Sequence, residues 1–168
     1  MFSHRNHAKA YISLGSNLGD RGGNLLLGVR GMMEAALCVT RLSSIYETEP
    51  VSDVDQTPFL NMVAEVGTPL PTPEQTMARL LRIEYLLGRT RDVKGGPRTI
   101  DLDLLFYADV QSLTEFLTLP HPRMHKRRFV LQPLVEIAPH LFHPLLHCTV
   151  AELLENSEDK SEVRRWVP

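Results

Sequence analysis

Residues 99–106 alternate between side chains of two kinds, which is typical of a half-buried β-strand. Asp101 and Asp103 should project from one face of this strand, with their Cα atoms roughly 6.5–7 Å apart. Carboxylates at this spacing can bind one hard cation or share two, and Mg²⁺ suits such oxygen ligands when substrate phosphates complete its octahedron. The opposite face should pack on a core through Ile100, Leu102, Leu104 and Phe106.

The loop before this strand concentrates four cations within residues 89–98. Taken separately, an acidic strand face and a basic loop are most simply interpreted as solvated surfaces. Arginine, however, suits bidentate contacts with phosphate oxygens, and paired glycines let the backbone close over a ligand. The loop and the strand together therefore favour a site for nucleotide phosphates.

The order of the expected elements is strand, helix, strand, strand, helix, strand. This is the split βαβ arrangement of an α+β, ferredoxin-like βαββαβ sandwich. Right-handed crossovers predict that the first and last strands lie side by side and parallel in the middle of the sheet, with both helices on one face. The opposite face would then carry Asp101 and Asp103. The expected strands are 11–14, 39–48, 59–66 and 99–106.

Local signals mark the ends of the two helices. Asp20 is a plausible N-cap for the first helix. Thr72 and Gln75 form a capping box for the second, with Pro73 at its first position and Gly88 as its C-terminal cap. Helical spacing predicts these apolar positions: Leu26, Val29, Met33 and Leu37 in the first helix, and Leu80, Ile83 and Leu87 in the second.

Beyond residue 107 we expect C-terminal additions to this sandwich. They comprise a hairpin, a short helix after Pro122 and a final helix that Thr149 and Glu152 would cap. The last residues, about 157–168, should be frayed, and residues 1–9 form a polar leader.

The length of 168 residues, 43% of them hydrophobic, predicts a single domain, 1–168. A net charge of −2 gives no general attraction to nucleic acid or to acidic membranes. Two cysteines, no apolar leader segment and no run long enough to span a bilayer predict a cytoplasmic protein without a disulfide framework.

A second basic segment, 121–129, combines arginines with His121 and Phe129. His121 either donates a hydrogen bond to a phosphate or is an ordinary surface histidine. Glu84, on the second helix, either accepts hydrogen bonds from a sugar or is solvated. Residues 15–23 lack the Lys-Ser/Thr ending of a P-loop. Arginines and cations, rather than a backbone cradle, would have to neutralise a triphosphate here.

Eight short motifs occur in order between about Tyr11 and Pro139. They are Gly15-Ser16-Asn17-Leu18-Gly19, Tyr46-Glu47-Thr48-Glu49-Pro50, Phe59-Leu60-Asn61, Arg82-Ile83-Glu84, Gly88-Arg89-Thr90-Arg91, Gly96-Pro97-Arg98-Thr99-Ile100-Asp101-Leu102-Asp103, Leu119-Pro120-His121-Pro122-Arg123 and Arg127-Arg128-Phe129-Val130-Leu131. With these motifs the chain resembles the 6-hydroxymethyl-7,8-dihydropterin pyrophosphokinases of folate biosynthesis. The resemblance implies that a diphosphate passes from ATP to the hydroxymethyl group of the pterin, with release of AMP.

The same resemblance implies roles for individual residues. Asp101 and Asp103 would be ligands of two Mg²⁺ ions and, with Arg89 and Arg98, the catalytic group. Phe59 and Phe129 would sandwich the pterin ring, and Asn61 would bind its polar edge. The implied ATP contacts are Glu84, Arg91, Lys94, Arg98, Leu104, Thr118, His121 and Arg127. The implied pterin contacts are Gly15, Thr48, Glu49, Val51, Phe59, Asn61 and Phe129.

Phe116 departs from the family pattern, because some members have an Arg there. Two other classes of protein stay open on the residues alone. One is a ferredoxin-like module that binds nucleotides or RNA without catalysis, and the other is a small phosphatase. The expected partners are the substrates ATP and the pterin. We expect a monomer that binds neither nucleic acid nor a membrane.

Overall fold

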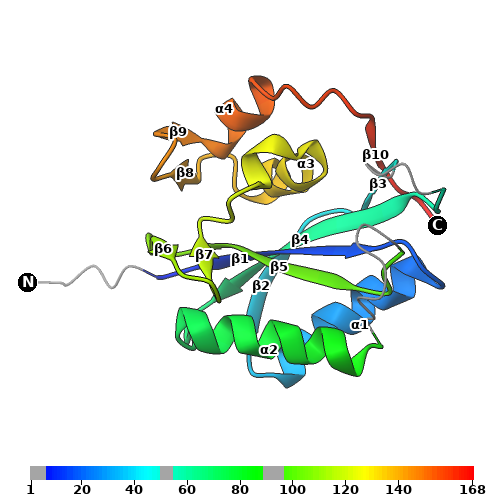
Figure 1. The fold of residues 1–168 in the computed structure, drawn as a ribbon, viewed down its shortest axis with the longest axis horizontal. Coiled ribbons are helices and arrows are strands. Elements are labelled where there is room, and N and C mark those ends of the chain that lie inside the picture. The colour runs from blue at the N-terminus through cyan, green and yellow to red at the C-terminus, as the bar shows by residue number, and fades with distance from the viewer. Residues whose placement is uncertain (1–6, 50–54, 89–96) are drawn as a thin grey trace, which may run out of the picture.

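In a computed structural model, the described residues are 7–49, 55–88 and 97–168. Their centre is a six-stranded sheet in the order β10-β3-β4-β1-β5, with β2 also pairing with β4 (Figure 1). The strands of this sheet are β1 (Ala10–Ser16), β2 (Cys38–Leu42), β3 (Tyr46–Thr48), β4 (Phe59–Gly67), β5 (Asp101–Tyr107) and β10 (Val163–Arg165).

This topology confirms the ferredoxin-like prediction but corrects one strand direction. β1 and β5 are neighbours, as predicted, yet they pair antiparallel. The reason is that each crossover helix joins parallel strands that are not adjacent, because a strand of the other βαβ unit lies between them. β4 separates β1 from β2 and β3, and β1 separates β4 from β5.

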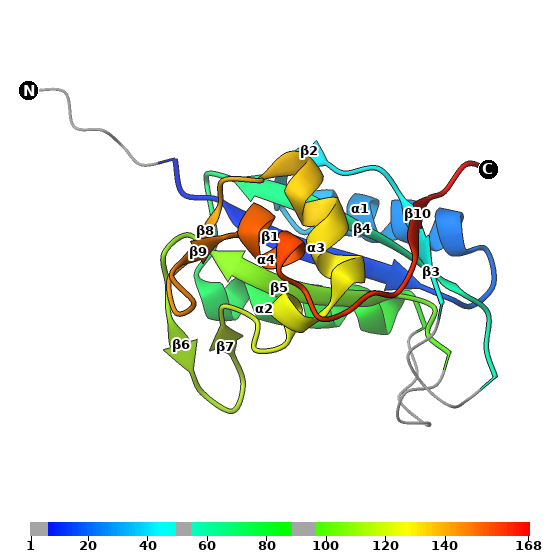
Figure 2. The same ribbon diagram turned by 90° about the horizontal axis from the view of Figure 1, so that it is seen from above.

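Helices cover both faces of the sheet (Figures 1 and 2). α1 (Arg21–Glu34) and α2 (Pro73–Leu86) bury one face in a first core with side chains such as Leu25, Leu80 and Leu102. On the other face, α3 (Arg128–Ile137) and α4 (Val150–Glu155) form a second core with Tyr11 and Val63. The smaller elements are β6 (Ser112–Leu113), β7 (Thr118–Leu119), η1 (Met124–Lys126), β8 (Phe142–His143) and β9 (Cys148–Thr149).

The predicted strand 39–48 is in fact two strands, β2 and β3. Ser43 interrupts the ladder, because its hydroxyl oxygen accepts the backbone N–H of Val63, at 2.9 Å. Such a local side-chain bond competes with regular pairing.

In β5, a register shift moves Phe106 to the face opposite to the predicted one. Tyr11 pairs with Phe106 and Ile12 with Leu104, so Leu105 is an extra residue. Ile100, Leu102 and Leu104 lie in the first core as predicted, whereas Phe106 joins the second. A β-bulge of this kind reverses the side-chain alternation beyond it.

The first helix begins at its predicted cap, and its buried positions were predicted only in part. Asp20 accepts the backbone N–H of Gly23 at 3.0 Å. Val29 and Leu37 are buried as predicted, whereas Leu26 and Met33 are each 61% exposed and the neighbouring Leu25 and Met32 are buried instead. The buried face is centred on Gly28, where a Cβ would lie 3.2 Å from Leu14. A glycine at the closest contact gives no hydrophobic signal.

The second helix agrees with its prediction. Both hydrogen bonds of the Thr72–Gln75 capping box are present, and Gly88 follows the helix with a φ of +78°. Leu80 and Ile83 are buried as expected. Thr149 and Glu152 form the second predicted capping box, on α4, and β6 and β7 form the expected hairpin. The short helix expected after Pro122 is the turn η1 followed by α3.

The frayed C-terminus was a wrong prediction. Within 157–168, β10 pairs antiparallel with β3, and the backbone N–H of Trp166 donates to the carbonyl of Ile45 at 2.8 Å. Of the predicted polar leader, residues 1–6 lie outside the described part. None of the helices in the described ranges is long and apolar enough to cross a membrane.

Candidate functional site

One row of paired residues crosses the sheet and links the two predicted halves of the site. Gly15 of β1 pairs with Asn61 of β4 on one side and with Asp101 of β5 on the other. Directly paired residues project from the same face, so Asn61 and Asp101 face the same side, with about 10 Å between their strands. Gly15 places no side chain between them.

Four of the predicted pterin contacts gather at one end of this row. The amide nitrogen of Asn61 donates to the Thr48 hydroxyl at 2.8 Å, and both residues are buried. A Cβ on Gly15 would lie 3.0 Å from Asn61 Oδ1 and 3.8 Å from the ring of Phe59. Phe129 lies at the start of α3 and Glu49 is exposed after β3.

The two predicted metal ligands lie on β5, away from the helices α1 and α2. The Asp101 carboxylate accepts a hydrogen bond from the Arg98 guanidinium at 2.7 Å, and the two side chains are 20% and 32% exposed. Asp103 is half-buried. In ranges 7–49, 55–88 and 97–168, no group of three or more His, Cys, Asp or Glu residues could hold a metal ion. Two accessible carboxylates fit a hard cation that takes its other ligands from phosphates and water.

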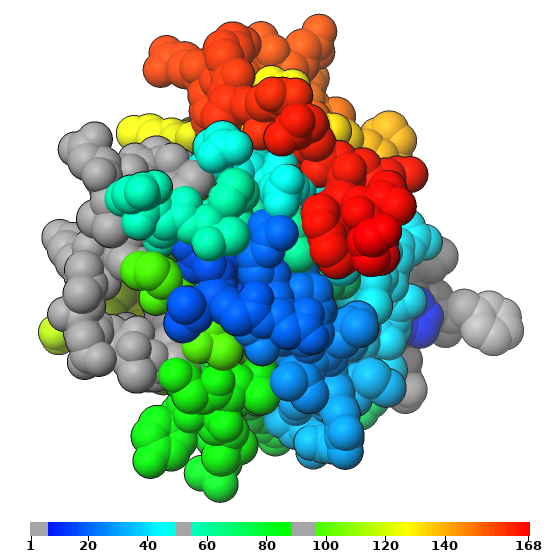
Figure 3. Space-filling model, turned by 90° about the vertical axis from the view of Figure 1, so that its right-hand side faces the viewer, coloured from blue at the N-terminus to red at the C-terminus, as the bar shows by residue number. Residues whose placement is uncertain are grey.

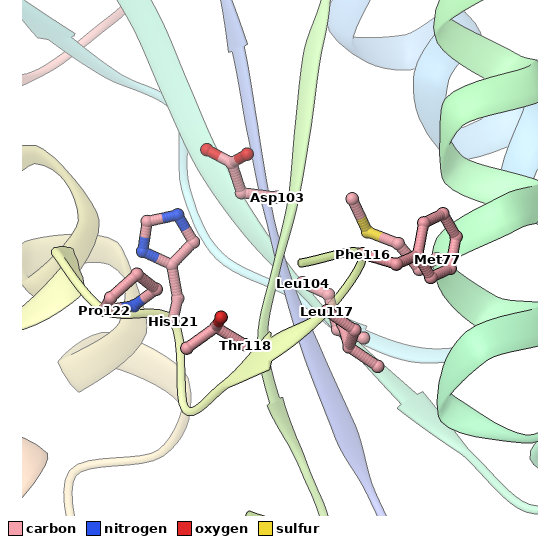
Figure 4. A pocket seen from close by; sticks show the side chains of 8 residues that line it. All are labelled: Met77, Asp103, Leu104, Phe116, Leu117, Thr118, His121 and Pro122. Atoms are coloured by element: carbon pink, nitrogen blue, oxygen red, sulfur yellow. The ribbon is translucent and has the colours of Figure 1, made fainter. Parts of the chain in front are cut away.

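Next to Asp103 is a cavity of about 170 Å³ that gathers three of the predicted ATP contacts (Figure 4). Thr118 comes from β7, His121 from the segment after it, and Leu104 from β5. Figure 4 shows Phe116 and Met77 across the strand from His121. Phe116 thus lines the cavity with an aromatic ring. The full lining is Met77, Asp103, Leu104, Phe116, Leu117, Thr118, His121 and Pro122.

His121 is held neutral near this cavity. Burial, followed by the cations Arg127 and Arg123, lowers the pKa of His121 to about 4, although the charge of Asp101 opposes them. Its Nδ1 accepts the backbone N–H of Arg123 at 3.2 Å. The proton of the neutral ring is therefore on Nε2, which can donate a hydrogen bond to a phosphate oxygen.

Arg127 is a partly buried cation beside the carboxylates. Its pKa is lowered by burial and then by Arg123, while Asp103 and Asp101 favour its charge. Its guanidinium carbon lies 5.7 Å from the centre of the Phe129 ring. This contact links a predicted phosphate ligand to a predicted pterin ligand.

Asn17 is a further site residue to which we assigned no role from the sequence. It is buried in the turn after β1, and its side chain accepts the Arg98 N–H at 2.7 Å and donates to the Thr57 carbonyl at 3.2 Å. Its amide nitrogen also donates to the Gln56 side chain at 2.7 Å. Asn17 therefore ties the residues that follow 50–54 to those that follow 89–96. A polar residue directly after a buried strand was the available signal.

The remaining predicted residues are not brought into this group. Glu84 is buried on α2 and does not line the cavity. Arg89, Arg91, Lys94 and Val51 lie outside the described residues.

Comparison with known proteins was made at the levels of family, sequence and structure. Residues 11–139 match the family model of 7,8-dihydro-6-hydroxymethylpterin-pyrophosphokinase (HPPK). The 2-amino-4-hydroxy-6-hydroxymethyldihydropteridine pyrophosphokinase of Bacillus subtilis is 51% identical, over 76% of this chain and 77% of the relative. The Aquifex aeolicus enzyme of the same name is 37% identical, over 82% of this chain and 85% of the relative.

Solved structures agree on the fold. A Plasmodium falciparum HPPK-DHPS structure superposes with a TM-score of 0.70 at 17% identity, covering 91% of this chain and 46% of that one. The match to the family model and the identity to both relatives show that this chain belongs to the 7,8-dihydro-6-hydroxymethylpterin-pyrophosphokinase family.

Proposed function

We propose that this protein transfers a diphosphate group from ATP to the hydroxymethyl oxygen of 6-hydroxymethyl-7,8-dihydropterin, giving AMP and the pterin diphosphate. Membership of the pyrophosphokinase family supports this reaction. The structural observation that carries it is the row of paired residues Asn61, Gly15 and Asp101. This row places the buried Asn61 amide and the Asp101 carboxylate on one face of the sheet, with no side chain from Gly15 between them.

The pterin half of the site is proposed to bind a flat heteroaromatic ring. The Asn61 amide donates one N–H to Thr48, which fixes its orientation and leaves its carbonyl and second N–H for the polar edge of the ring. Phe59 and Phe129 would stack on the ring faces. Glu49 and Val51 are proposed as further contacts near the end of β3.

The ATP half is proposed to lie over the cavity beside Asp103. Leu104 and Thr118 would contact the nucleotide, and His121 would donate from Nε2 to a phosphate oxygen. Arg98 and Arg127 would bind and orient the diphosphate as its charge changes, which is the main protein contribution to phosphoryl chemistry. The same proposal assigns phosphate contacts to Arg89, Arg91 and Lys94, and a nucleotide contact to Glu84.

Asp101 and Asp103 are the residues proposed to hold two Mg²⁺ ions. When bound, the ions would neutralise phosphate charge and favour attack on phosphorus. The protein's own part is to keep both carboxylates on one face of β5 and to supply Arg98 as a counter-ion to Asp101. We also propose a single-domain monomer in the cytoplasm. The free thiols of Cys38 and Cys148 are consistent with a reducing compartment.

The test is to incubate the protein with ATP, Mg²⁺ and the hydroxymethyl dihydropterin and to separate the products. AMP and the pterin diphosphate should form in equal amounts. Asp101→Asn and Asp103→Asn should reduce the rate by at least about 100-fold, in the range expected when a charge-stabilising group is removed. Asp109→Asn changes an exposed carboxylate just beyond β5 and is the matched control. Formation of ADP, or of inorganic phosphate without pterin, would contradict the proposal.

A further inference from the structure

The C-terminal segment 157–166 lies outside the matched range 11–139, yet it contacts two elements of the proposed pterin site. Figures 1 and 2 show it running from the end of α4 past α3 to the edge of the sheet at β3. One end of this path is near Phe129, and the other is near Thr48.

The first contact is made by Asp159 at the start of α3. Its Oδ2 accepts the backbone N–H of Arg128 at 2.9 Å. Its Oδ1 accepts both the backbone N–H of Ser161, at 2.9 Å, and the Ser161 hydroxyl, at 2.6 Å. A carboxylate at this position accepts a backbone N–H that has no acceptor within the helix, and its negative charge interacts favourably with the positive end of the helix dipole. Arg128 lies between Arg127 and Phe129, so this bond holds the part of α3 that carries both predicted ligands.

The second contact is the strand β10. Val163 pairs with Thr48 and Arg165 with Tyr46, on the edge of β3 that β4 does not cover. The side chain of Arg165 also lies 3.6 Å from Glu136 of α3, which in turn accepts the hydroxyl of Tyr46 at 2.6 Å. The segment therefore contacts α3 at both of its ends and β3 at its C-terminal end.

The C-terminal segment also contacts α1, through Trp166. Its backbone N–H donates to Ile45, and its partly buried ring packs beside the first core. A Cβ added to Gly22 would lie 3.1 Å from the ring, so the ring rests directly on the first turn of α1. Figure 3 shows the C-terminal residues against the blue surface of that turn.

We propose that the segment 157–166 is a brace that sets the position of Phe129 relative to Thr48 and Asn61, with Asp159 and Trp166 as its anchors. Both anchors are positioning residues that act on pterin affinity, and this inference rests on the proposed function. A ring held between two side chains requires their spacing to be kept within about 0.5 Å. The ATP cavity, formed by β5, α2 and residues 116–122, has no contact with the brace among its lining residues.

The test measures the two ligands separately by equilibrium titration, without turnover. Asp159→Ala and Trp166→Ala should each raise the Kd for the hydroxymethyl dihydropterin about tenfold, which corresponds to about 1.4 kcal/mol. The Kd for a non-hydrolysable ATP analogue should change less than about twofold in Trp166→Ala, whereas Asp159→Ala, which releases the turn that also carries Arg127, should weaken both ligands. Trp166→Phe keeps an aromatic ring at this position and should retain most of the wild-type affinity for the pterin. Arg164→Ala is the control, because it alters an exposed side chain on the same strand.

A double-mutant cycle separates positioning from loss of stability. Gly22→Ala should weaken pterin binding when Trp166 is present and have no effect in Trp166→Ala, because only the indole ring meets the added methyl group. Equal loss of both ligands in Trp166→Ala, or a lowered Tm with unchanged pterin affinity, would overturn the inference. A wild-type protein that does not bind the pterin would overturn the proposed function as well, whereas wild-type binding that both alanine variants retain would overturn the brace alone.

Discussion

Gly15 lies between Asn61 and Asp101, at a position where an added side chain would meet the pterin half of the site. A Cβ at this position would lie 3.0 Å from Asn61 Oδ1. We expect Gly15→Ala to displace the Asn61 amide and to raise the KM for the pterin by about tenfold, with a smaller effect on the KM for ATP. Steady-state kinetics with each substrate varied would measure this. Gly67→Ala, at the far end of β4, is the comparison for a tight glycine outside the site. An unchanged KM for the pterin in Gly15→Ala would contradict this prediction.

His121 provides a test of the phosphate side at the same scale. Its pKa of about 4 in the free protein reflects burial and two neighbouring arginines. The negative charge of bound ATP should raise this pKa, because a nearby anion favours the imidazolium form. Affinity for ATP should then increase as the pH falls toward the pKa of the bound state. The pH dependence of the His121 C2–H resonance, with and without an ATP analogue, measures the shift, and exposed His140 is an internal reference. Identical His121 titration curves with and without the analogue would contradict a phosphate contact at His121.

Individual ligand residues were predictable where the residues that act together are also close together in the sequence. Asp101 and Asp103 could be paired from their spacing alone, because the strand geometry fixes it. Asn17 could not be assigned, because its partners, Arg98 and Thr57, come from segments far away in the chain. Its function depends on where two loops return to the sheet, which local sequence does not encode.

At the scale of the element, capping chemistry determines where α2 begins. Thr72→Ala removes a hydroxyl that accepts the Gln75 N–H at 3.2 Å. We expect the free energy of unfolding to fall by about 1 kcal/mol, the usual cost of losing an N-cap. Thr72→Ser keeps the hydroxyl and should retain most of the stability. Denaturant unfolding of the three proteins would test this, and equal stability of Thr72→Ala and wild type would show that the cap contributes nothing.

Elements were predicted well when their signals are local and poorly when a neighbour defines them. Thr72, Gln75 and Gly88 lie within the helix ends that they mark. The strand β10 has only three residues, two of them arginines, and exists because β3 offers an unpaired edge. Two positions of the buried face of α1, Leu26 and Met33, were misplaced, because Gly28 at the centre of that face has no side chain to mark it.

The whole molecule should lose stability in acid, in two ranges of pH. Burial is the largest cause of the lowered pKa values of His121, His125 and His143. The unfolded chain binds protons at these residues near pH 6.5. Folding therefore becomes less favourable as the pH falls from about 6.5, and for His121 the loss continues to about pH 4.

Three carboxylates extend this loss to lower pH. Burial alone would raise the pKa values of Glu65, Glu136 and Asp159, but their hydrogen bonds and cationic neighbours bring them below their ordinary values. Their stabilisation is present above the ordinary carboxyl pKa and disappears below it. Urea unfolding at pH 7.5, 6, 5 and 4 should show a steady decrease in the free energy of unfolding, and His121→Gln should lessen the decrease above pH 4. A constant value from pH 7.5 to 5 would contradict this.

The general topology followed from the order of elements, whereas the direction of β5 beside β1 did not. Direction depends on which strand is inserted within each crossover, and this is decided by packing of the complete sheet. The second core was not predicted either, since its apolar residues come from β1, β4, β5, η1 and the helices that follow it. Only the assembled molecule brings them together.

The pairing of β10 with β3 has a consequence for biosynthesis. The edge of the sheet at Thr48 gains its outer neighbour only after residue 163 has been added, more than a hundred positions later. A ribosome-bound chain that ends before this point would already contain every residue proposed to touch ATP or the pterin. Its pterin-binding surface would nevertheless be unfinished, so competence to bind the ring should arise among the final events of synthesis.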